Sequence, residues 1–454
     1  ESDPVTDPKR SFEAWWKAQV GKDKLDDVPG NLRKLVNAGP DETTASKDVE
    51  AILTHWKKAV WSEKPAALTT AINELDDNEK AKVELEKKIP KTFVFADLPK
   101  MRDSFVMQRG AYDRPGEKVT RATPAFLPTL NVANESVPNR LDLAKWIISP
   151  DQPLTSRVTV NRLWQQFFGV GLVKTSGDFG LQGEPPSHPD LLDWLASEYQ
   201  ASGWNTRHMV KLIVTSRAFR RASHIAPEQL QHDPENRLYA RGPRFRLDAE
   251  QIRDNALAVS GLLVLKQGGK GVNPYQPPNI WEPVGFSRSN TRNYKQGSGE
   301  DLYRRTMYTF LKRTAPHPSL VNFDAPNREQ FCARRERSNT PLQALQLMND
   351  IQHIEAARSL AGRSLLEVQG DDRERITWLF RVVLARLPSA DEHTTVANFL
   401  ERSRTRYATD LESAKKAIAH GESPVPAELS PVELASWTLV SNMMLNLDET
   451  VTRN

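Results

Sequence analysis

The chain has 454 residues, 38% of them hydrophobic and 26% charged, which suits about two or three soluble domains of roughly 150 residues each. Its net charge of only +4 argues against a dedicated nucleic-acid-binding protein. A single cysteine, Cys332, excludes an internal disulfide, a covalently attached haem and a four-cysteine cluster within this chain. We interpret Cys332 as a small buried apolar side chain, with a reactive thiol as the alternative.

Residues 1–91 are predicted to be helical and peripheral. One apolar stripe begins at Trp15 and Trp16, and a second runs at helical spacing from Val49 to Val60. The tryptophans are interpreted as packing anchors. Residues 65–88 are rich in charge and predict a long, solvent-exposed helix.

Residues 92–138 are predicted to connect two helical regions. Short strands are expected at 92–95 and 104–109, and the Pro115-Gly116 pair marks a turn.

No run of the chain approaches the roughly 18 apolar residues that would cross a membrane. The chain begins at Glu1 rather than Met, so we expect the precursor to include a preceding segment.

From residue 139 to 454 the pattern is that of one large helical domain. The apolar periodicity and the Pro and Gly residues predict helices at 141–147, 153–167, 189–195, 204–217, 249–265, 341–362, 371–387, 390–406 and 431–446. A long irregular loop is predicted over 268–337. The expected fold class is therefore mainly α, a multi-helix domain with long irregular loops and a few short strands.

Several polar residues are candidates for chemistry in the loop before residue 189. Asp178, Glu184 and His188 could act as acid, base and orienting group if this loop folds over a cleft. Alternatively, His188 caps the following helix and Asp178 accepts backbone bonds in a tight turn. The histidines show no HExxH or HxH spacing, so no metal site is predicted.

A second set of candidates surrounds a predicted helix start near residue 249. The set comprises Arg241, Arg244, Arg246, Glu250, Arg253 and Asp254. Glu250 and Asp254 share one helix face, and Arg246 and Arg253 lie within a turn of them. Arginine–carboxylate pairs of this kind join domains because the guanidinium is a rigid bidentate donor. The alternatives are an anion-binding site or a pair of hydrolytic carboxylates.

The stretch 312–350 has the highest density of polar candidates. Asp324 is a candidate catalytic carboxylate, and a polar network beneath the core is expected around it. The candidate ligand-binding residues, which suit an anionic or polyhydroxylated molecule, are Arg246, Arg328, Arg335, Arg337 and Asn339. Asn339 or Thr340 is expected to cap the helix that begins at Pro341.

From about Arg140 onward the chain carries an ordered set of motifs: Arg162–Trp164, Phe167, Gly169–Val173, Asp178–Gly180, Pro186–Pro189, Leu192–Ala196, Gly203-Trp204, Lys312–Thr314, Phe323–Pro326, Arg328 and Asn339–Leu345. These motifs resemble the planctomycete PSD domain, a domain of unknown function. Upstream, Arg109-Gly110, Tyr112, Pro115–Glu117 and Pro124 are similar to the linker that precedes this domain.

The resemblance implies a secreted, periplasmic or cell-envelope protein. It further implies cytochrome-like and helical modules in the N-terminal part of the same precursor, so that any haem c lies there and none in this chain. Neighbouring genes in the family, rich in sulfatases and polysaccharide-degrading enzymes, imply a glycan ligand.

Three hypotheses about function follow from this resemblance and from the candidate residues. The first is the substrate- or partner-binding part of a cytochrome-linked protein that oxidises carbohydrate. The second is a hydrolase or lyase that uses Asp178, His188, Glu250 or Asp324 without a redox step, and the third is a non-catalytic scaffold.

Overall fold

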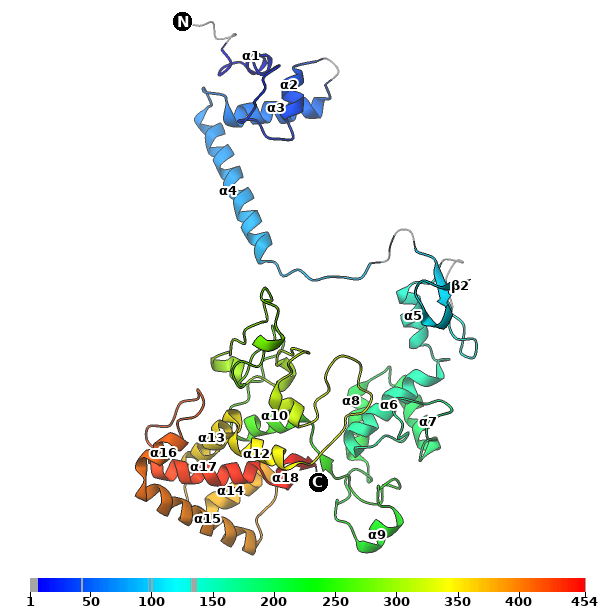
Figure 1. The fold of residues 1–454 in the computed structure, drawn as a ribbon, viewed down its shortest axis with the longest axis vertical. Coiled ribbons are helices and arrows are strands. Elements are labelled where there is room, and N and C mark those ends of the chain that lie inside the picture. The colour runs from blue at the N-terminus through cyan, green and yellow to red at the C-terminus, as the bar shows by residue number, and fades with distance from the viewer. Residues whose placement is uncertain are drawn as a thin grey trace. The chain divides into compact units, whose positions relative to one another are not determined.

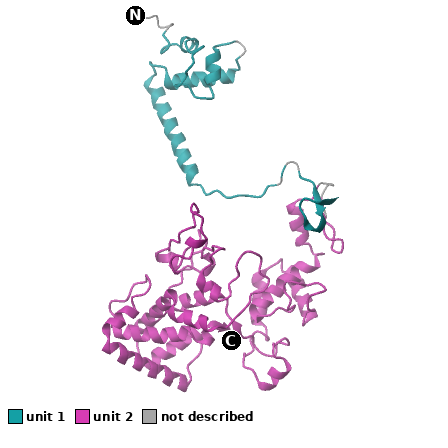
Figure 2. Ribbon diagram, in the orientation of Figure 1, with its two compact units in different colours: residues 1–119 teal, residues 120–454 magenta. Residues whose placement is uncertain are grey.

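The computed structural model of the chain describes residues 7–41, 44–96, 98, 101–130, 132 and 137–453. These residues fall into two compact units, residues 1–119 and residues 120–454 (Figure 2). The predicted division into three parts, with boundaries after residues 91 and 138, stays a prediction.

The first unit begins with a small helical core. Helices α1 (Phe12–Lys17), α2 (Arg33–Ala38) and α3 (Ser46–Ala59) enclose Trp15, Trp16 and Trp56, each at most 5% exposed. This burial confirms that these tryptophans are packing anchors, because large aromatic side chains stabilise a core by the apolar area they remove from water.

Helix α4 (Ala66–Lys88) follows and has no buried residue, which confirms the predicted solvent-exposed helix. The predicted strand at 92–95 is wrong: this segment is irregular, and Phe93 and Phe95 are exposed. It has the composition of a strand, but no strand of the described residues pairs with it. Strand β1 (Ser104–Met107) pairs antiparallel with β2 (Pro115–Val119), with a bulge between Phe105 and Met107.

The second unit contains two groups of packed helices (Figure 1). We call the first the α6–α8 group. It comprises α6 (Pro153–Phe168), α7 (Pro189–Ala201) and α8 (Thr206–Thr215), with α5 (Arg140–Ile147) preceding it in the chain. Pro at the first position of α6 and α7 favours helix initiation because its missing N–H has no intrahelical acceptor there. Val160, Trp164 and Leu195 lie in their shared core.

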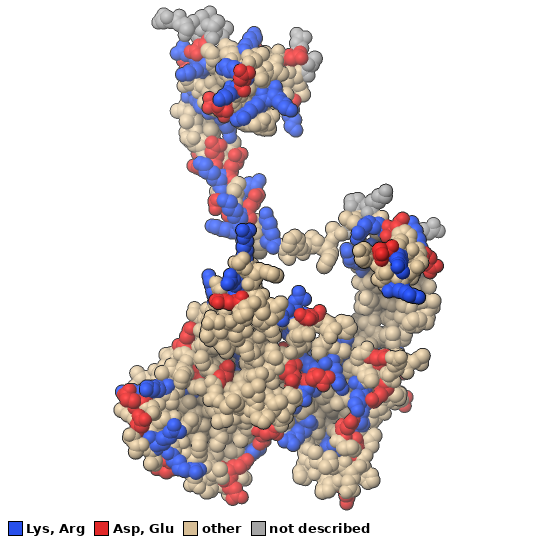
Figure 3. Space-filling model, in the orientation of Figure 1, with Lys and Arg blue, Asp and Glu red and all other residues tan. Residues whose placement is uncertain are grey.

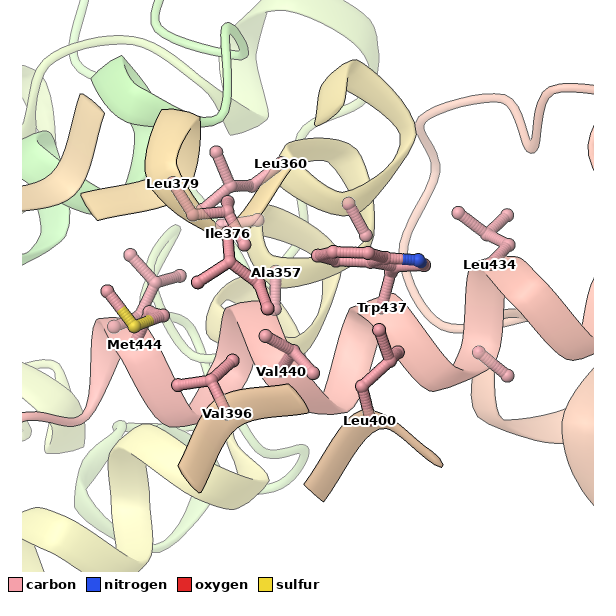
Figure 4. Packing of buried hydrophobic residues seen from close by; sticks show 14 of the residues in the cluster. Ala357, Leu360, Ile376, Leu379, Val396, Leu400, Leu434, Trp437, Val440 and Met444 are labelled. Carbon is pink, nitrogen blue, oxygen red and sulfur yellow. The ribbon is translucent and has the colours of Figure 1, made fainter. Parts of the chain in front are cut away.

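We call the second the α13–α17 group. Its helices are α13 (Ile351–Glu367), α14 (Asp372–Leu384), α15 (Ala390–Thr409), α16 (Leu411–Ala417) and α17 (Pro431–Leu445). Helix α17 packs along both α13 and α15. Figure 4 shows Trp437 projecting from α17 among Leu360, Leu379 and Leu400, which come from three other helices.

The remaining elements connect the two groups or flank them. They are α9 (Pro227–His232), β3 (Phe245–Arg246), α10 (Ala249–Val259), α11 (Pro318–Asn322), α12 (Pro341–Asn349), α18 (Asp448–Val451), β4 (Thr452–Arg453) and short 3₁₀ helices at Glu282–Val284, Gly299–Leu302 and Thr306–Tyr308. A further short 3₁₀ helix, Gln108–Gly110, belongs to the first unit and follows β1. Strand β3 pairs antiparallel with β4, placing Phe245 opposite Arg453 and Arg246 opposite Thr452.

The mainly α fold class is confirmed, and so are most of the predicted helices. Several helix ends are wrong, and the helix predicted over 189–195 continues to Ala201 as α7. The helix predicted over 249–265 ends at Val259, and the one predicted over 341–362 breaks at Asp350. Asp350 ends α12 and its side chain accepts the Gln352 N–H at the start of α13, so one residue serves both helices. Among the described residues, no helix is long and apolar enough to cross a membrane.

An ion-pair cluster joins the start of α15 to α18 and predicts a pH effect. Arg386 donates to both Glu392 and Glu449, with N–O distances of 2.6–2.9 Å. Hydrogen bonds from Arg386 lower the pKa of Glu392 from 4.5 to about 2. The native state therefore keeps this carboxylate ionised between about pH 4.5 and 2, where the unfolded chain takes up a proton.

The stabilisation from Glu392 is thus present above about pH 4.5 and is lost as the pH falls toward 2. These side chains are about a third exposed, so solvent screening limits the effect to about 1 kcal/mol. We expect Arg386→Gln to lower the thermal midpoint at pH 7 and to lower it less at pH 3. Equal losses at both pH values would contradict this assignment, and Arg402→Gln on exposed α15 surface serves as the control.

Candidate functional site

A cleft of about 710 Å³ opens in the second unit. Its walls come from four segments: the end of α6 with the turn after it, residues 223–246, residues 337–339, and residues 448–452. The pairing of β3 with β4 brings residues 448–452 next to residues 223–246, because it holds Arg246 opposite Thr452. The cleft therefore combines residues that lie far apart in the sequence.

Gly169 shapes the wall at the end of α6. Its φ is +80°, a conformation that L side chains rarely adopt, and a Cβ there would lie 2.8 Å from the Phe245 ring. The ring of Phe245 can therefore pack closely against the turn after α6. The guanidinium of Arg337 lies 4.4 Å from the centre of the same ring and donates to the Gly169 carbonyl oxygen.

Positive charge dominates this cleft. Figure 3 shows basic and acidic side chains interspersed over the visible face of the molecule, whereas the cleft lining is unbalanced. Among the described residues, its carboxylates are Glu235 and Asp448. Its cationic side chains are Lys174, Arg237, Arg241, Arg244, Arg246 and Arg337. We call this site the arginine cleft.

Arg241 is the most unusual member of the arginine cleft. It is 5% exposed, and its Nη2 donates to the Pro234 carbonyl oxygen at 2.8 Å. Within the described part of the chain, its Nη1 has no hydrogen-bond acceptor and no carboxylate lies within ion-pair distance. A buried charge without a counterion is costly, so such a group points to an anion that binds there.

The loop that carries Arg241 is held rigidly by its own side chains. Asp233 accepts the backbone N–H groups of Arg237 and Leu238 at 2.7 and 2.8 Å, and Asn236 exchanges two hydrogen bonds with the backbone of Arg241. Asn236 and Tyr239 both have positive φ, a strained conformation that persists where the surrounding structure enforces it. The cationic groups are therefore positioned in advance of any ligand.

Three of the predicted ligand-binding residues lie together in the cleft. Arg246 donates to the Asn339 side-chain oxygen and lies 3.6 Å from a carboxylate oxygen of Asp448. Arg337 lies 3.4 Å from an oxygen of Asp248. Each of these arginines has a protein partner, and each also lines the cleft.

Arg328 and Arg335, the other two predicted ligand-binding residues, lie outside the cleft lining and pair with Glu250. Arg335 makes a bidentate contact with Glu250 at 2.5 and 3.1 Å, and Arg328 lies 3.6 Å away. Burial opposes ionisation of Glu250, but the hydrogen bonds from Arg335 outweigh it and lower the pKa of this carboxyl. This arrangement joins α10 to the loop before α12.

The four catalytic candidates are not brought together in one cleft. Asp178 accepts the Gly180 N–H at 2.7 Å, which confirms the backbone bond predicted for its turn. His188 is the N-cap residue of α7, but its side chain makes no capping bond and instead contacts the Ser187 hydroxyl at 3.1 Å. Asp324 accepts from both the backbone and the hydroxyl of Ser338, and Glu250 is paired with arginine.

The stretch 312–350 is more open than the predicted buried network. Arg328 and Arg334 have side chains about half exposed, whereas Gln343 is 1% exposed. The predicted burial of Cys332 is wrong, because this residue is exposed and its thiol contacts the Arg334 carbonyl oxygen at 3.1 Å. The neighbouring Phe331 is 86% exposed, so the apolar side chain next to Cys332 also points away from a core.

Sequence reasoning noted Arg241 and Arg244 but missed Lys174, Arg237 and Asp448 as members of one site. Asp448 is about 200 residues from Arg244 in the chain and pairs with it at 2.8 Å. No local motif signals this pairing, since it depends on the long-range β3–β4 contact. In the described residues, no group of three or more His, Cys, Asp or Glu side chains could hold a metal ion.

The model of one protein family matches residues 139–400, more than half of the chain. Its description is PSD1, protein of unknown function (DUF1553). The chain belongs to the PSD1 family. Neither a curated protein nor a solved structure matches the chain.

The arginine cleft lies largely within the PSD1 match. All six of its cationic side chains fall inside residues 139–400, whereas Asp448 and Thr452 lie beyond it. The cationic character of the cleft is thus a feature of the PSD1 part of the chain.

Proposed function

We propose that this PSD1 chain is a ligand-binding module whose arginine cleft takes an anionic glycan, one that carries carboxylate or sulfate groups. The observation that carries the proposal is the set of six cationic side chains against two carboxylates, with Arg241 buried and lacking a counterion. The planar guanidinium forms paired, charge-assisted hydrogen bonds with carboxylate and sulfate oxygens.

The neutral lining of the cleft supports a hydroxyl-rich ligand. Ser223, Asn236, Ser338, Asn339 and Thr452 present hydroxyl and amide groups beside the arginines. Such groups both donate and accept hydrogen bonds, which is what sugar hydroxyls require. The glycan suggested by the family resemblance is consistent with this lining.

The resemblance also supports a place for the chain in a larger envelope protein. We propose that cytochrome-like and helical modules of the same precursor act beside it, with the glycan as their shared substrate. Haem c attachment needs two thiols and a histidine in a CxxCH motif. Cys332 is followed by Ala, Arg, Arg and Glu, so this chain does not fit that group.

The placement of the four catalytic candidates favours binding over hydrolysis. Asp178, His188, Glu250 and Asp324 each engage a local partner instead of facing a shared space. We therefore expect this chain to release no new reducing ends from a bound oligosaccharide. Product formation that Glu250→Gln or Asp324→Asn abolishes would favour the hydrolase or lyase hypothesis.

A non-catalytic scaffold is the second candidate function. Arg404 donates to both Asp372 and Glu433, and Arg386 bridges Glu392 and Glu449. These ion pairs join helices, and each arginine charge is neutralised by carboxylates of the chain itself. A scaffold made in this way requires no ligand in the arginine cleft, so the binding experiment separates the two candidates.

Calorimetric titration of the full chain tests the proposed function. The probes are an oligogalacturonate tetrasaccharide for carboxylate, a κ-carrageenan tetrasaccharide for sulfate, and cellotetraose as the neutral control. We expect an anionic probe to bind, to weaken with added salt, and cellotetraose not to bind. Arg241→Gln should weaken binding by about 10- to 100-fold, since a hydrogen bond to a charged group contributes about 1.5–3 kcal/mol.

Arg402→Gln provides the matched control. Arg402 is exposed on α15 and does not line the arginine cleft. The Arg402→Gln substitution removes the same charge from the same unit, so the affinity of this variant for the anionic probe should equal that of the unmodified chain. The proposal fails if neither anionic probe binds, or if Arg402→Gln weakens binding as much as Arg241→Gln.

A further inference from the structure

A second, smaller cavity adjoins the arginine cleft. Its volume is about 210 Å³, less than a third of that of the cleft. Arg246, Asn339 and Asp448 line both cavities, so the two share a wall. A ligand that extends from one to the other would contact all three side chains.

The smaller cavity differs from the cleft in its charge. Arg246 and Asp448 are its charged lining residues in the described structure, and they lie 3.6 Å apart as an ion pair. The rest of the lining is neutral, and beyond Asn339 it comprises Phe323, Gln343, Ala344, Leu347, Asn446 and Val451. We call it the neutral pocket.

A buried acceptor in the neutral pocket lacks a donor. Gln343 is 1% exposed, and its Nε2 donates to the Asn322 carbonyl oxygen at 2.8 Å and to the Ser338 hydroxyl at 3.1 Å. These two bonds fix the orientation of the amide. Its Oε1 has no hydrogen-bond partner among the described residues. Buried polar atoms in proteins are nearly always paired, so this oxygen points to a donor supplied by a ligand.

An uncharged hydroxyl group fits these features. A hydroxyl donates to the Gln343 Oε1 and can accept from the Asn446 side-chain amide, while Phe323 and Leu347 offer apolar contact to a ring. A second anionic group fits poorly, because it would face the unpaired oxygen of Gln343 and compete with Asp448 for Arg246.

We propose that the neutral pocket is a subsite for one uncharged, hydroxyl-bearing sugar unit next to the anionic unit in the arginine cleft. The ligand class is therefore an oligosaccharide in which charged and uncharged units are neighbours. This inference rests on the proposed function, and it adds a specificity that charge alone does not supply.

The test compares oligosaccharides of equal length that differ in charge pattern, using the full chain. In the carboxylate arm, a hyaluronan tetrasaccharide has an acid on every second unit and oligogalacturonate has one on every unit. In the sulfate arm, κ-carrageenan and ι-carrageenan tetrasaccharides stand in the same relation. We expect the alternating member to bind at least tenfold more tightly in the arm that binds, although it has fewer charges.

A cavity-filling variant locates the effect. Ala344 is exposed on α12 and lines the neutral pocket, so Ala344→Phe should fill the pocket without unfolding the chain. We expect this variant to remove the advantage of the alternating ligand and to leave binding of the fully charged one unchanged. Ala408→Phe on the exposed face of α15 is the control, and it should change neither affinity.

The outcomes separate the two proposals. If no anionic oligosaccharide binds, the proposed function fails. If the fully charged ligand binds as tightly as the alternating one, the cleft binds anions but the neutral subsite is wrong. Equal weakening of both ligands by Ala344→Phe would also overturn the subsite.

Discussion

Replacing Trp437 by alanine is expected to lower the free energy of unfolding by about 3–5 kcal/mol. Trp437 is 0% exposed and projects from α17 into the core shared with α13, α14 and α15 (Figure 4). Truncation removes a large apolar area from the core and leaves a cavity that the surrounding helices cannot fully close. Urea denaturation followed by far-ultraviolet circular dichroism measures the loss.

Trp194→Ala is the matched control for this prediction. Trp194 lies on α7 in the same unit and is 51% exposed, so the same substitution should change stability by about 0.5 kcal/mol or less. A loss below about 1 kcal/mol for Trp437→Ala, or equal losses for both variants, would show that the α13–α17 core is not packed as described.

Replacing Glu355 by leucine is expected to cost about 3–5 kcal/mol, the second large effect. Glu355 is 0% exposed and accepts from the Tyr303 hydroxyl at 2.7 Å and the Ser423 N–H at 2.6 Å. Arg358, 2% exposed, lies 3.8 Å from the same carboxylate. The substitution leaves a buried guanidinium without a counterion and two donors without an acceptor.

The loop 418–423 should respond first to the loss of Glu355. Arg358 donates to the carbonyl oxygens of Ile418 and Ser423, so both partners hold this loop against α13. We expect faster hydrogen exchange of the Ser423 amide in Glu355→Leu. Combining it with Arg358→Met should cost less than the sum of the single losses, because the pair is coupled. Additive losses would contradict the coupling.

Burial of Glu355 also explains the glycine at position 421. Gly421 has φ of +87°, and a Cβ there would lie 2.2 Å from the Glu355 carboxyl carbon. The sequence alone gives no reason for this glycine, because Gly421 lies in a loop and the carboxylate that approaches it lies in α13, far away in the chain. The contact becomes evident only when α13 and the loop are placed together.

Local signals in the sequence accounted for much of the fold. Pro153 begins α6 and Gly169 ends it, and the apolar periodicity of the helix is strong. The existence and the ends of α6 therefore follow from the sequence. The break between α12 and α13 at Asp350 does not follow from the sequence, since the apolar pattern continues on both sides of it. Residues 92–95 have strand-forming side chains, but in the described part of the chain no strand pairs with them.

The arginine cleft was only partly predictable for a related reason. Arg246, Arg337 and Asn339 stood out because they lie in dense polar stretches. Asp448 and Thr452 join them through the two-residue pairing of β3 with β4, which is too short to leave a pattern. The missing counterion of Arg241 is a property of three-dimensional packing, and no spacing in the sequence reports it.

The most direct test of the anionic-glycan proposal is hydrogen–deuterium exchange of the full chain with and without a saturating anionic tetrasaccharide. We expect slower exchange in residues 234–246 and 337–339, the segments that line the arginine cleft, and clearly weaker protection in Arg241→Gln at the same ligand concentration. Slower exchange confined to other segments, or protection that persists unchanged in Arg241→Gln, would contradict it.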